Sequence, residues 1–189
     1  MALGMEKARG KEFARKLVAV IGDSTFIHSG ITGIIDMVYN GATSTVVILD
    51  NGTTGMTGHQ DHPATGKNAK GEPAPALNLE RLLLAVGVKH VRVADPVDVW
   101  AFTKIMKEET AREELSVVIA RRPCALLGRE KRAPYAISAA CRQCGACLAA
   151  GCPAIRKTDA GYAIQADACN ACGLCANLCA AGAIGKGEA

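Results

Sequence analysis

The sequence predicts two parts: a doubly wound, parallel α/β sheet, followed by a small cysteine-rich domain. Over residues 17–122, short apolar runs of strand type alternate with helical apolar stripes. Parallel strands need crossovers that return over a face of the sheet, so this alternation favours a parallel sheet with helices packed on it. Eight of the nine cysteines lie between residues 141 and 179, which marks the second part.

The first half of the sheet domain contributes two strands and one helix. Residues 17–21 and 45–49 are apolar runs of strand type. Between them we expect a helix that begins near Gly30 and is closed by Gly41. Its apolar stripe consists of Ile31, Ile34, Ile35 and Val38.

The second half adds two more helices and two more strands. A helical stripe ends at Gly87 and is followed by a strand over residues 90–94. Asp95 then has the position of an N-cap, with Pro96 as the first helical residue. Residues 116–120 form the fourth predicted strand. The helical stripe before Gly87 consists of Leu79, Leu82, Leu83 and Val86.

The composition changes at both ends of the sheet domain. Residues 121–134 are rich in Arg, Lys, Pro and Gly, which predicts a linker over 123–134 and a separate domain over 135–189. Residues 1–16 are predicted to be a solvated basic leader, with a docking surface for an acidic partner as the alternative. The basic residues of this leader are Lys7, Arg9, Lys11, Arg15 and Lys16.

The overall composition argues against two classes of partner. A net charge of +4 and an aromatic content of 4% give little support for nucleic-acid binding. No apolar run is long enough to span a bilayer, and the N-terminus lacks the apolar segment of a signal peptide. We therefore expect no nucleic-acid partner, no membrane and a reducing, cytoplasmic location.

Two cysteine runs have the ligand spacing of 4Fe-4S clusters. The runs are Cys141-x2-Cys144-x2-Cys147-x4-Cys152-Pro153 and Cys169-x2-Cys172-x2-Cys175-x3-Cys179. The fourth cysteine of each run usually ligates the other cluster. The predicted ligand sets are Cys141, Cys144, Cys147 and Cys179 for one cluster, and Cys169, Cys172, Cys175 and Cys152 for the other. Disulfides and structural zinc remain as alternatives.

This region resembles the bacterial-type two-cluster ferredoxins over about residues 135–187, which implies a small α+β domain. It departs from the family pattern at two places. The four residues 148–151 precede Cys152, where the usual number is three, and Ala180 stands where proline is common. The resemblance implies that both clusters form, because neither change removes a ligand.

Polar residues follow the first two predicted strands. They are Gly22-Asp23-Ser24 and Asp50-Asn51-Gly52-Thr53. Ligands of such sheets bind beyond the carboxyl ends of the strands, where the N–H groups of a helix N-terminus attract phosphate. Asp23 and Asn51 offer the oxygen ligands that magnesium takes when it holds a diphosphate. An aspartate that merely caps a helix is the alternative.

These residues resemble the signature of thiamine diphosphate binding domains, with Ser24 and Asp50 as departures. The resemblance implies that Asp23, the side chain of Asn51 and the carbonyl of Thr53 hold magnesium, with Gly22 and Ser24 beside the cofactor. Residues 22–31 and 57–63 more specifically resemble the alpha subunits of indolepyruvate ferredoxin oxidoreductases. There the thiamine domain is followed by a two-cluster ferredoxin domain, and the resemblance spans about residues 15–185.

That family oxidatively decarboxylates aryl pyruvates with coenzyme A and passes electrons to ferredoxin. The resemblance therefore implies thiamine diphosphate, magnesium and two 4Fe-4S clusters as cofactors. It also implies a second oxidoreductase subunit and a pyrimidine-binding domain, supplied either by a longer form of this chain or by a partner chain. Two alternatives stay open: a noncatalytic electron carrier, and a subunit acting on other 2-oxo acids.

Several loop residues near the predicted cofactor end are candidates for direct roles. His28 and His59 are predicted to contact substrate or cofactor, because imidazole suits proton transfer near neutral pH. His62 is a weaker candidate, and any of the three could instead bond to backbone groups. Met56 either flanks the thiazolium ring or packs in the protein. A structural role is expected for His90, and buried packing for Cys124.

Overall fold

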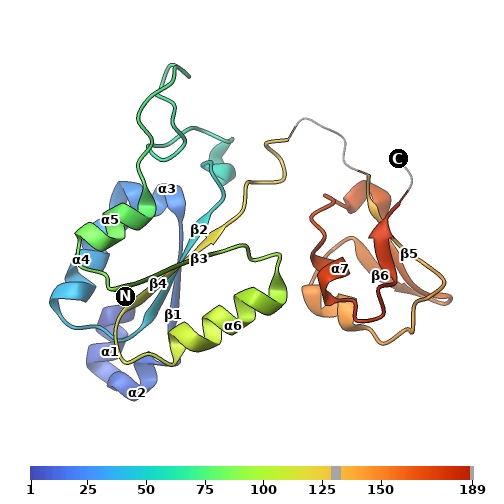
Figure 1. The fold of residues 1–189 in the computed structure, drawn as a ribbon, viewed down its shortest axis with the longest axis horizontal. Helices are drawn as coiled ribbons and strands as arrows, with labels where there is room; N and C mark the ends of the chain where they lie inside the picture. The colour runs from blue at the N-terminus through green and yellow to red at the C-terminus, as the bar shows by residue number, and fades with distance from the viewer. Residues whose placement is uncertain (129–132, 188–189) are drawn as a thin grey trace. The chain divides into compact units, whose positions relative to one another are not determined.

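A computed structural model of the chain describes residues 1–128 and 133–187. It divides into two compact units, one made of Met1–Pro96 and Trp100–Leu127 and the other of Val97–Val99 and Gly128–Ala189 (Figure 1). Residues 129–132, which belong to the segment predicted as the linker, lie outside the described part, as do residues 188 and 189. Within the described residues, no helix combines the length and apolar character needed to cross a membrane.

The first unit is built on a four-stranded sheet with all strands parallel, in the order β1-β2-β4-β3. Its strands are β1 (Val18–Gly22), β2 (Thr45–Asp50), β3 (His90–Ala94) and β4 (Ser116–Arg121). Each matches a predicted strand to within one residue at either end. The register pairs Gly22 with Leu49 and Leu49 with Ala120, so the strands end together at one edge.

Helices cover both faces of this sheet (Figure 1). α4 (Ile31–Tyr39) and α5 (Leu79–Ala85) pack on one face, and α6 (Val99–Thr110) packs on the other. Successive strand residues point to opposite faces, so both faces of a strand can be apolar. In β4, Val117 and Ile119 meet the first layer, while Val118 meets the second. The sheet is therefore doubly wound, as the alternation of elements predicts.

Two helix starts differ from the predictions. The first helical run begins at Asp23, with α3 (Asp23–Thr25) and a π-helical turn (Phe26–Gly30) before α4, and does not begin near Gly30. Ile35, expected in its buried stripe, is 46% exposed, and Met37 takes a core position instead. The helix turns its Ile34 and Met37 face toward the sheet.

The second difference concerns α6, which begins at Val99 rather than directly after Asp95. Asp95 is therefore not its N-cap. The carboxylate of Asp95 lies 2.6 Å from the guanidinium of Arg122, at the carboxyl edge of the sheet. Asp95 thus takes part in a long-range ion pair that the sequence did not suggest.

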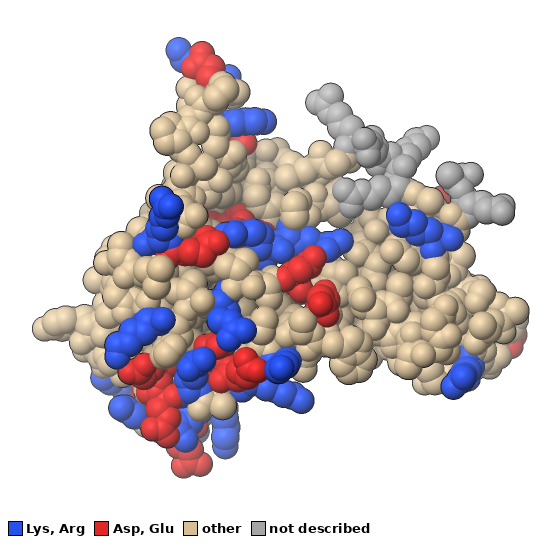
Figure 2. Space-filling view, viewed as in Figure 1, with Lys and Arg blue, Asp and Glu red and all other residues tan. Residues whose placement is uncertain are grey.

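The N-terminal residues, predicted as a basic leader, form α1 (Ala2–Arg9) and α2 (Lys11–Ala14), and their basic side chains are exposed. Ala14 is fully buried, and the buried carboxylate of Glu6 accepts hydrogen bonds from the N–H and the hydroxyl of Thr43. Of the basic residues in this segment, Arg15 forms an ion pair with Glu113. Figure 2 shows basic and acidic residues intermixed over the sheet unit, so no basic patch stands out on that face.

The second unit repeats one motif twice. Each half contains a short strand, a cysteine-rich turn, a short helix and a second strand, and the strands pair into two antiparallel ribbons. The first strands of the halves carry the same residues, Tyr135-Ala136-Ile137 and Tyr162-Ala163-Ile164. The elements are β5 (Tyr135–Ile137), η3 (Ala146–Ala150), β6 (Ile155–Thr158), β7 (Gly161–Ile164), η4 (Ala166–Ala168), α7 (Leu174–Leu178) and β8 (Ile184–Lys186).

Candidate functional site

Asp23 lies at the carboxyl edge of the sheet, directly after β1, and is only 2% exposed. Its Oδ1 accepts a hydrogen bond from the N–H of Ser24 at 2.7 Å. Its Oδ2 accepts from the N–H groups of Asn51 and Gly52 at 3.1 and 3.0 Å. The register of β1 and β2 brings these loops together, so the structure places the two predicted polar segments side by side.

The loop after β2 is ordered by its own polar side chains. Asn51 Oδ1 accepts from the N–H of Thr53 at 3.0 Å, an Asx turn that fixes the path of the chain. The hydroxyl of Thr54 donates to Ser24 Oγ at 2.9 Å. Ser24 therefore links the start of the helical run to the β2 loop. Gly22, which was predicted to follow the strand, is its last residue, immediately before Asp23.

The predicted histidines share one cavity of about 690 Å³. His28 comes from the π-helical turn after β1, rather than from a loop ahead of the helix, and His59 comes from the loop after β2. Lys67, which the sequence did not single out, also lines this cavity. The imidazole groups and the ammonium group that line this cavity, together with the carboxylate of Asp61, suit an anionic ligand such as a carboxylate or phosphate at the basic groups.

Two further residues of this loop region differ from the expectations. Met56 is fully exposed, so the packing alternative for its side chain does not hold. Cys124 is only partly buried; its Sγ lies 3.9 Å from His59 Nε2, and its N–H donates to the carbonyl of Asn51 at 2.9 Å. Cys124 therefore lies at the edge of the candidate site rather than in a core.

In the second unit, the two cysteine turns have matching backbone conformations. The residue before the second cysteine of each run is left-handed, with φ of 53° at Gln143 and 56° at Ala171. The residue after that cysteine is a left-handed glycine, with φ of 75° at Gly145 and 82° at Gly173. In the first turn the N–H of Gln143 lies 3.4 Å from Cys141 Sγ, whereas in the second the N–H of Cys172 donates to Asn170 Oδ1 at 3.2 Å.

The surroundings of the cysteines can be described for each of the two predicted ligand sets. Burial raises the pKa of the Cys147 thiol, and the nearby thiols of Cys141, Cys144 and Cys179 raise it further. A cavity of about 270 Å³ is lined by the other four, Cys152, Cys169, Cys172 and Cys175. Among the described residues, however, no three His, Cys, Asp or Glu side chains come close enough together to hold a metal ion.

Comparison with known families identifies the first unit. Residues 1–120 match the family model described as "Thiamine pyrophosphate enzyme, C-terminal TPP binding domain", where thiamine pyrophosphate is another name for thiamine diphosphate. The chain belongs to this family. The match starts at residue 1, so it includes α1 and α2, which the sequence prediction had set apart as a leader.

Curated relatives extend the similarity over both units. The chain is 37% identical over 185 residues to "Indolepyruvate oxidoreductase subunit IorA" of Archaeoglobus fulgidus, covering 94% of this chain and 30% of the relative. It is 37% identical over 196 residues to the subunit of the same name from Pyrococcus horikoshii, covering 98% of this chain and 30% of the relative. The chain thus spans about 30% of the length of these relatives, and the predicted resemblance to this subunit is confirmed.

A solved structure supports the fold of the family. A chain of the 2-oxoglutarate:ferredoxin oxidoreductase from Magnetococcus marinus superposes with a TM-score of 0.52 at 22% identity. The superposition covers 65% of this chain and 43% of that chain.

The site of the thiamine pyrophosphate domain fits magnesium and a diphosphate by its chemistry. Asp23 Oδ1 accepts only one of the three N–H groups that bond to the carboxylate, which leaves a lone pair for a cation. Gly52 has a φ of 70°, and no other atom lies within 4 Å of the position that a Cβ would take. The loop therefore leaves room where the polar groups converge.

His62, which the sequence analysis treated as a weaker candidate than His28 and His59, lies next to Asp23 in the structure. Its side chain is fully buried, and Nε2 lies 3.3 Å from Asp23 Oδ2. The only local signal is the Pro63 that follows, because proline favours the second position of a tight turn. The residues that bury His62 are distant in sequence, so a local pattern could not reveal its surroundings.

Arg121 was also missed, although it anchors the edge of the site. Its guanidinium lies 2.6 Å from the carboxylate of Asp50 and makes a two-pronged contact with Glu80 at 2.8 and 2.9 Å. The hydrogen bond from Arg121 holds the pKa of Glu80 below its usual value, and Glu80 in turn raises the pKa of Arg121. Arg121 thereby joins the ends of β2 and β4 to the start of α5.

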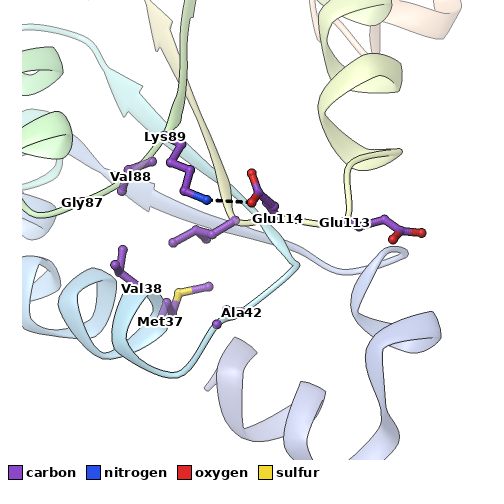
Figure 3. A pocket seen from close by; sticks show the side chains of 10 residues that line it. Met37, Val38, Ala42, Gly87, Val88, Lys89, Glu113 and Glu114 are labelled. Carbon is purple, nitrogen blue, oxygen red and sulfur yellow. Dashed lines mark hydrogen bonds and ion pairs between the residues drawn. The ribbon is translucent and has the colours of Figure 1, made fainter.

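A second cavity, of about 270 Å³, lies at the opposite edge of the sheet (Figure 3). Apolar side chains such as Met37 and Val88 line it beside the ion pair of Lys89 with Glu114, at 2.8 Å. Glu114 also lies 2.8 Å from His90 Nε2. His90 thus belongs to this far edge and not to the candidate site, in agreement with its expected structural role.

Proposed function

We propose that this chain carries the diphosphate-binding half of a thiamine diphosphate site in an indolepyruvate-type 2-oxo acid:ferredoxin oxidoreductase. One observation carries the proposal: a buried carboxylate, Asp23, held by backbone N–H groups where two parallel strands end. The curated relatives named as indolepyruvate oxidoreductase subunits support the substrate class.

In this proposal Asp23, Asn51 and the carbonyl of Thr53 hold magnesium, and magnesium holds the diphosphate. The donor set is one carboxylate, one amide and one carbonyl, all hard oxygen ligands. Gly22, Ser24 and Met56 lie beside the cofactor. When bound, thiamine diphosphate supplies the carbon nucleophile that attacks the ketone of a 2-oxo acid and permits loss of carbon dioxide.

The cavity lined by His28, His59 and Lys67 is the proposed substrate side of the site. The ammonium of Lys67 favours the carboxylate of a 2-oxo acid. His28 and His59 donate hydrogen bonds or move a proton at the substrate oxygen, which suits imidazole near neutral pH. The aryl group and the coenzyme A that accepts the acyl group complete the proposed substrate set.

We further propose that residues 135–189 are a two-cluster ferredoxin domain joined by a linker over 123–134 to the thiamine domain. One 4Fe-4S cluster is bound by Cys141, Cys144, Cys147 and Cys179, the other by Cys169, Cys172, Cys175 and Cys152. Two features support this partition: the second set lines one cavity, and Cys147 lies near the other three members of the first set. These cysteines would hold the clusters, and the clusters would supply one-electron transfer toward ferredoxin.

The proposed enzyme includes a pyrimidine-binding half in addition to the residues described here. Thiamine enzymes activate the aminopyrimidine with a glutamate from a second domain, and no described acidic residue lies in such a domain here. The curated relatives are about three times as long as the matched region. We propose that a pyrimidine-binding domain or chain and a second oxidoreductase subunit complete the enzyme.

Anaerobic reconstitution tests the function. The chain is mixed with a partner that supplies the pyrimidine half, with thiamine diphosphate, magnesium and coenzyme A, and then with a 2-oxo acid. Aryl pyruvates should reduce the clusters faster than pyruvate does, measured by stopped-flow absorbance. Reduction without any partner would contradict the half-site. No reduction with any partner or 2-oxo acid would instead favour a noncatalytic electron carrier.

A further inference from the structure

The imidazole of His62 lies in a fully buried position against Asp23. The side chains of His62 and Asp23 are 0% and 3% exposed, and Nε2 of the ring lies 3.3 Å from Asp23 Oδ2. His62 is among the residues that line the cavity shared with His28 and His59, but its side chain is closed off from solvent and is directed at the carboxylate of Asp23. Its contact in the structure is therefore with Asp23.

The turn that carries His62 fixes the direction of the ring. The N–H and the hydroxyl of Thr65 both donate to the carbonyl of His62 at 2.9 Å, with Pro63 at the second turn position. The N–H of Ala64 donates to His62 Nδ1 at 3.3 Å. A neutral imidazole whose Nδ1 accepts a hydrogen bond carries its proton on Nε2. The proton therefore faces Asp23.

The acceptor positions of Asp23 explain why this proton has no ideal partner. Each carboxylate oxygen offers about two lone-pair positions. At Oδ2 these accept the N–H groups of Asn51 and Gly52, so the Nε2–H of His62 is a third donor there and makes no regular hydrogen bond. Oδ1 accepts only the N–H of Ser24. The three donors around Oδ2 thus leave Oδ1 as the oxygen with an open lone pair.

We propose that His62 is a positioning residue that holds Asp23 in the rotamer with Oδ1 toward magnesium. This inference rests on the proposed function. The proton of His62 blocks Oδ2 from a cation and opposes rotation of the carboxylate, since rotation would bring Oδ2 to the metal. Residues that orient a metal ligand from behind are known to matter nearly as much as the ligand. His62 also ties the loop after β2 to the end of β1.

Two variants of His62 separate this role from simple packing. His62→Leu keeps an apolar body but removes the donor, whereas His62→Gln retains an N–H at a similar reach. Magnesium-dependent binding of inorganic diphosphate, measured by calorimetry, is the probe because it does not require the pyrimidine half. We expect His62→Leu to weaken magnesium binding about tenfold or more, in the range seen for such supporting residues. His62→Gln should recover most of the affinity.

His90→Gln is the matched control, because His90 lies at the opposite edge of the sheet and should leave diphosphate binding unchanged. If the wild-type chain binds no magnesium diphosphate, the proposed function fails. If it binds and His62→Leu binds equally well, only the positioning role is overturned. Imidazole ¹⁵N spectra give a second measurement should His62→Leu not fold. They should show the Nε2-protonated form of His62 and a change in its signals in Asp23→Asn; the other tautomer, or no change, would overturn the inference.

Discussion

The two units of this chain differ in what holds them together. The sheet unit has a continuous apolar core, with fully buried residues such as Leu83, Val117 and Val118 on the helices and both faces of the sheet. In the described part of the cysteine unit, the buried cluster consists of only four residues, and two of them are cysteines. These four residues are Cys147, Ile155, Cys175 and Ile184.

This difference in packing implies that bound cofactors affect the folding of the two units differently. A domain as small as the cysteine unit buries too little apolar surface for independent stability, and such domains usually need metals or disulfides. The sheet unit reaches its fold through packing and then presents a prepared site at one edge. We expect iron to stabilise the fold of the cysteine unit, and magnesium and thiamine diphosphate to bind a sheet unit that is already folded.

Removal of iron should have the largest effect, and it tests whether the cysteine unit depends on iron for its fold while the sheet unit does not. Anaerobic chelation should abolish hydrogen-exchange protection in residues 135–187, because the buried cysteines lose the centre around which they are organised. Strands β1 to β4 should keep their protection, which serves as the internal control. Protection of the cysteine unit that survives complete loss of iron would contradict the contrast between the units.

The iron content of the chain tests which cysteines bind the clusters of the cysteine unit. Anaerobically prepared protein should contain about eight irons and eight acid-labile sulfides per chain, as expected for two 4Fe-4S clusters. Cys175→Ser should lower the content, since Cys175 belongs to a predicted set. Cys124→Ser is the matched control and should keep the full content, because Cys124 lies in the sheet unit near His59. A wild-type count near four, or loss of iron in Cys124→Ser, would show that the ligand sets are wrong.

A cavity in the core of the sheet unit should strongly lower the free energy of unfolding. Leu83→Ala removes a fully buried side chain of α5 and should lower the free energy of unfolding by about 2–5 kcal/mol. Leu84→Ala, on the same helix but 57% exposed, should change it by no more than about 0.5 kcal/mol. Denaturant unfolding followed by far-UV circular dichroism measures both. Equal effects of the two substitutions would show that α5 does not pack as described.

A substitution at the candidate site should lower the affinity for thiamine diphosphate. Asp23→Ala removes the charged magnesium ligand, so affinity for thiamine diphosphate in the assembled enzyme should fall at least about tenfold, or about 1.4 kcal/mol. The iron content should not change, because the substitution lies in the other unit. Calorimetric titration with and without magnesium provides the measurement. Unchanged affinity in the assembled enzyme would rule out the thiamine site at Asp23.

The elements that local sequence patterns determine could be predicted, and the long-range contacts could not. The four strands are apolar and β-branched, so their limits follow within one residue. The Asp95-Pro96 pattern placed the start of α6 too early, since the helix begins at Val99, and the ion pair of Asp95 with the distant Arg122 could not be foreseen. The proximity of Asp23 and Asn51 followed from the rule that parallel strands end at one edge. The burial of His62 depends on how a long loop folds back onto that edge, which no short pattern encodes.

The smallest predicted effect concerns the ion pair at the edge of the sheet unit. Arg121 lowers the pKa of Glu80 below its ordinary value of 4.5, chiefly through a hydrogen bond. A carboxyl group whose pKa is lower in the folded state stabilises the fold above its unfolded pKa, and this contribution is lost as the pH falls through the folded value. Glu80 is partly exposed, so Glu80→Gln should cost no more than about 1 kcal/mol at pH 7. Denaturant unfolding of both proteins at several pH values should show this difference shrinking below pH 4.5. A difference that stays constant down to pH 3, about one unit below the ordinary range for glutamate, would mean that the contact stabilises the fold through packing and not through charge.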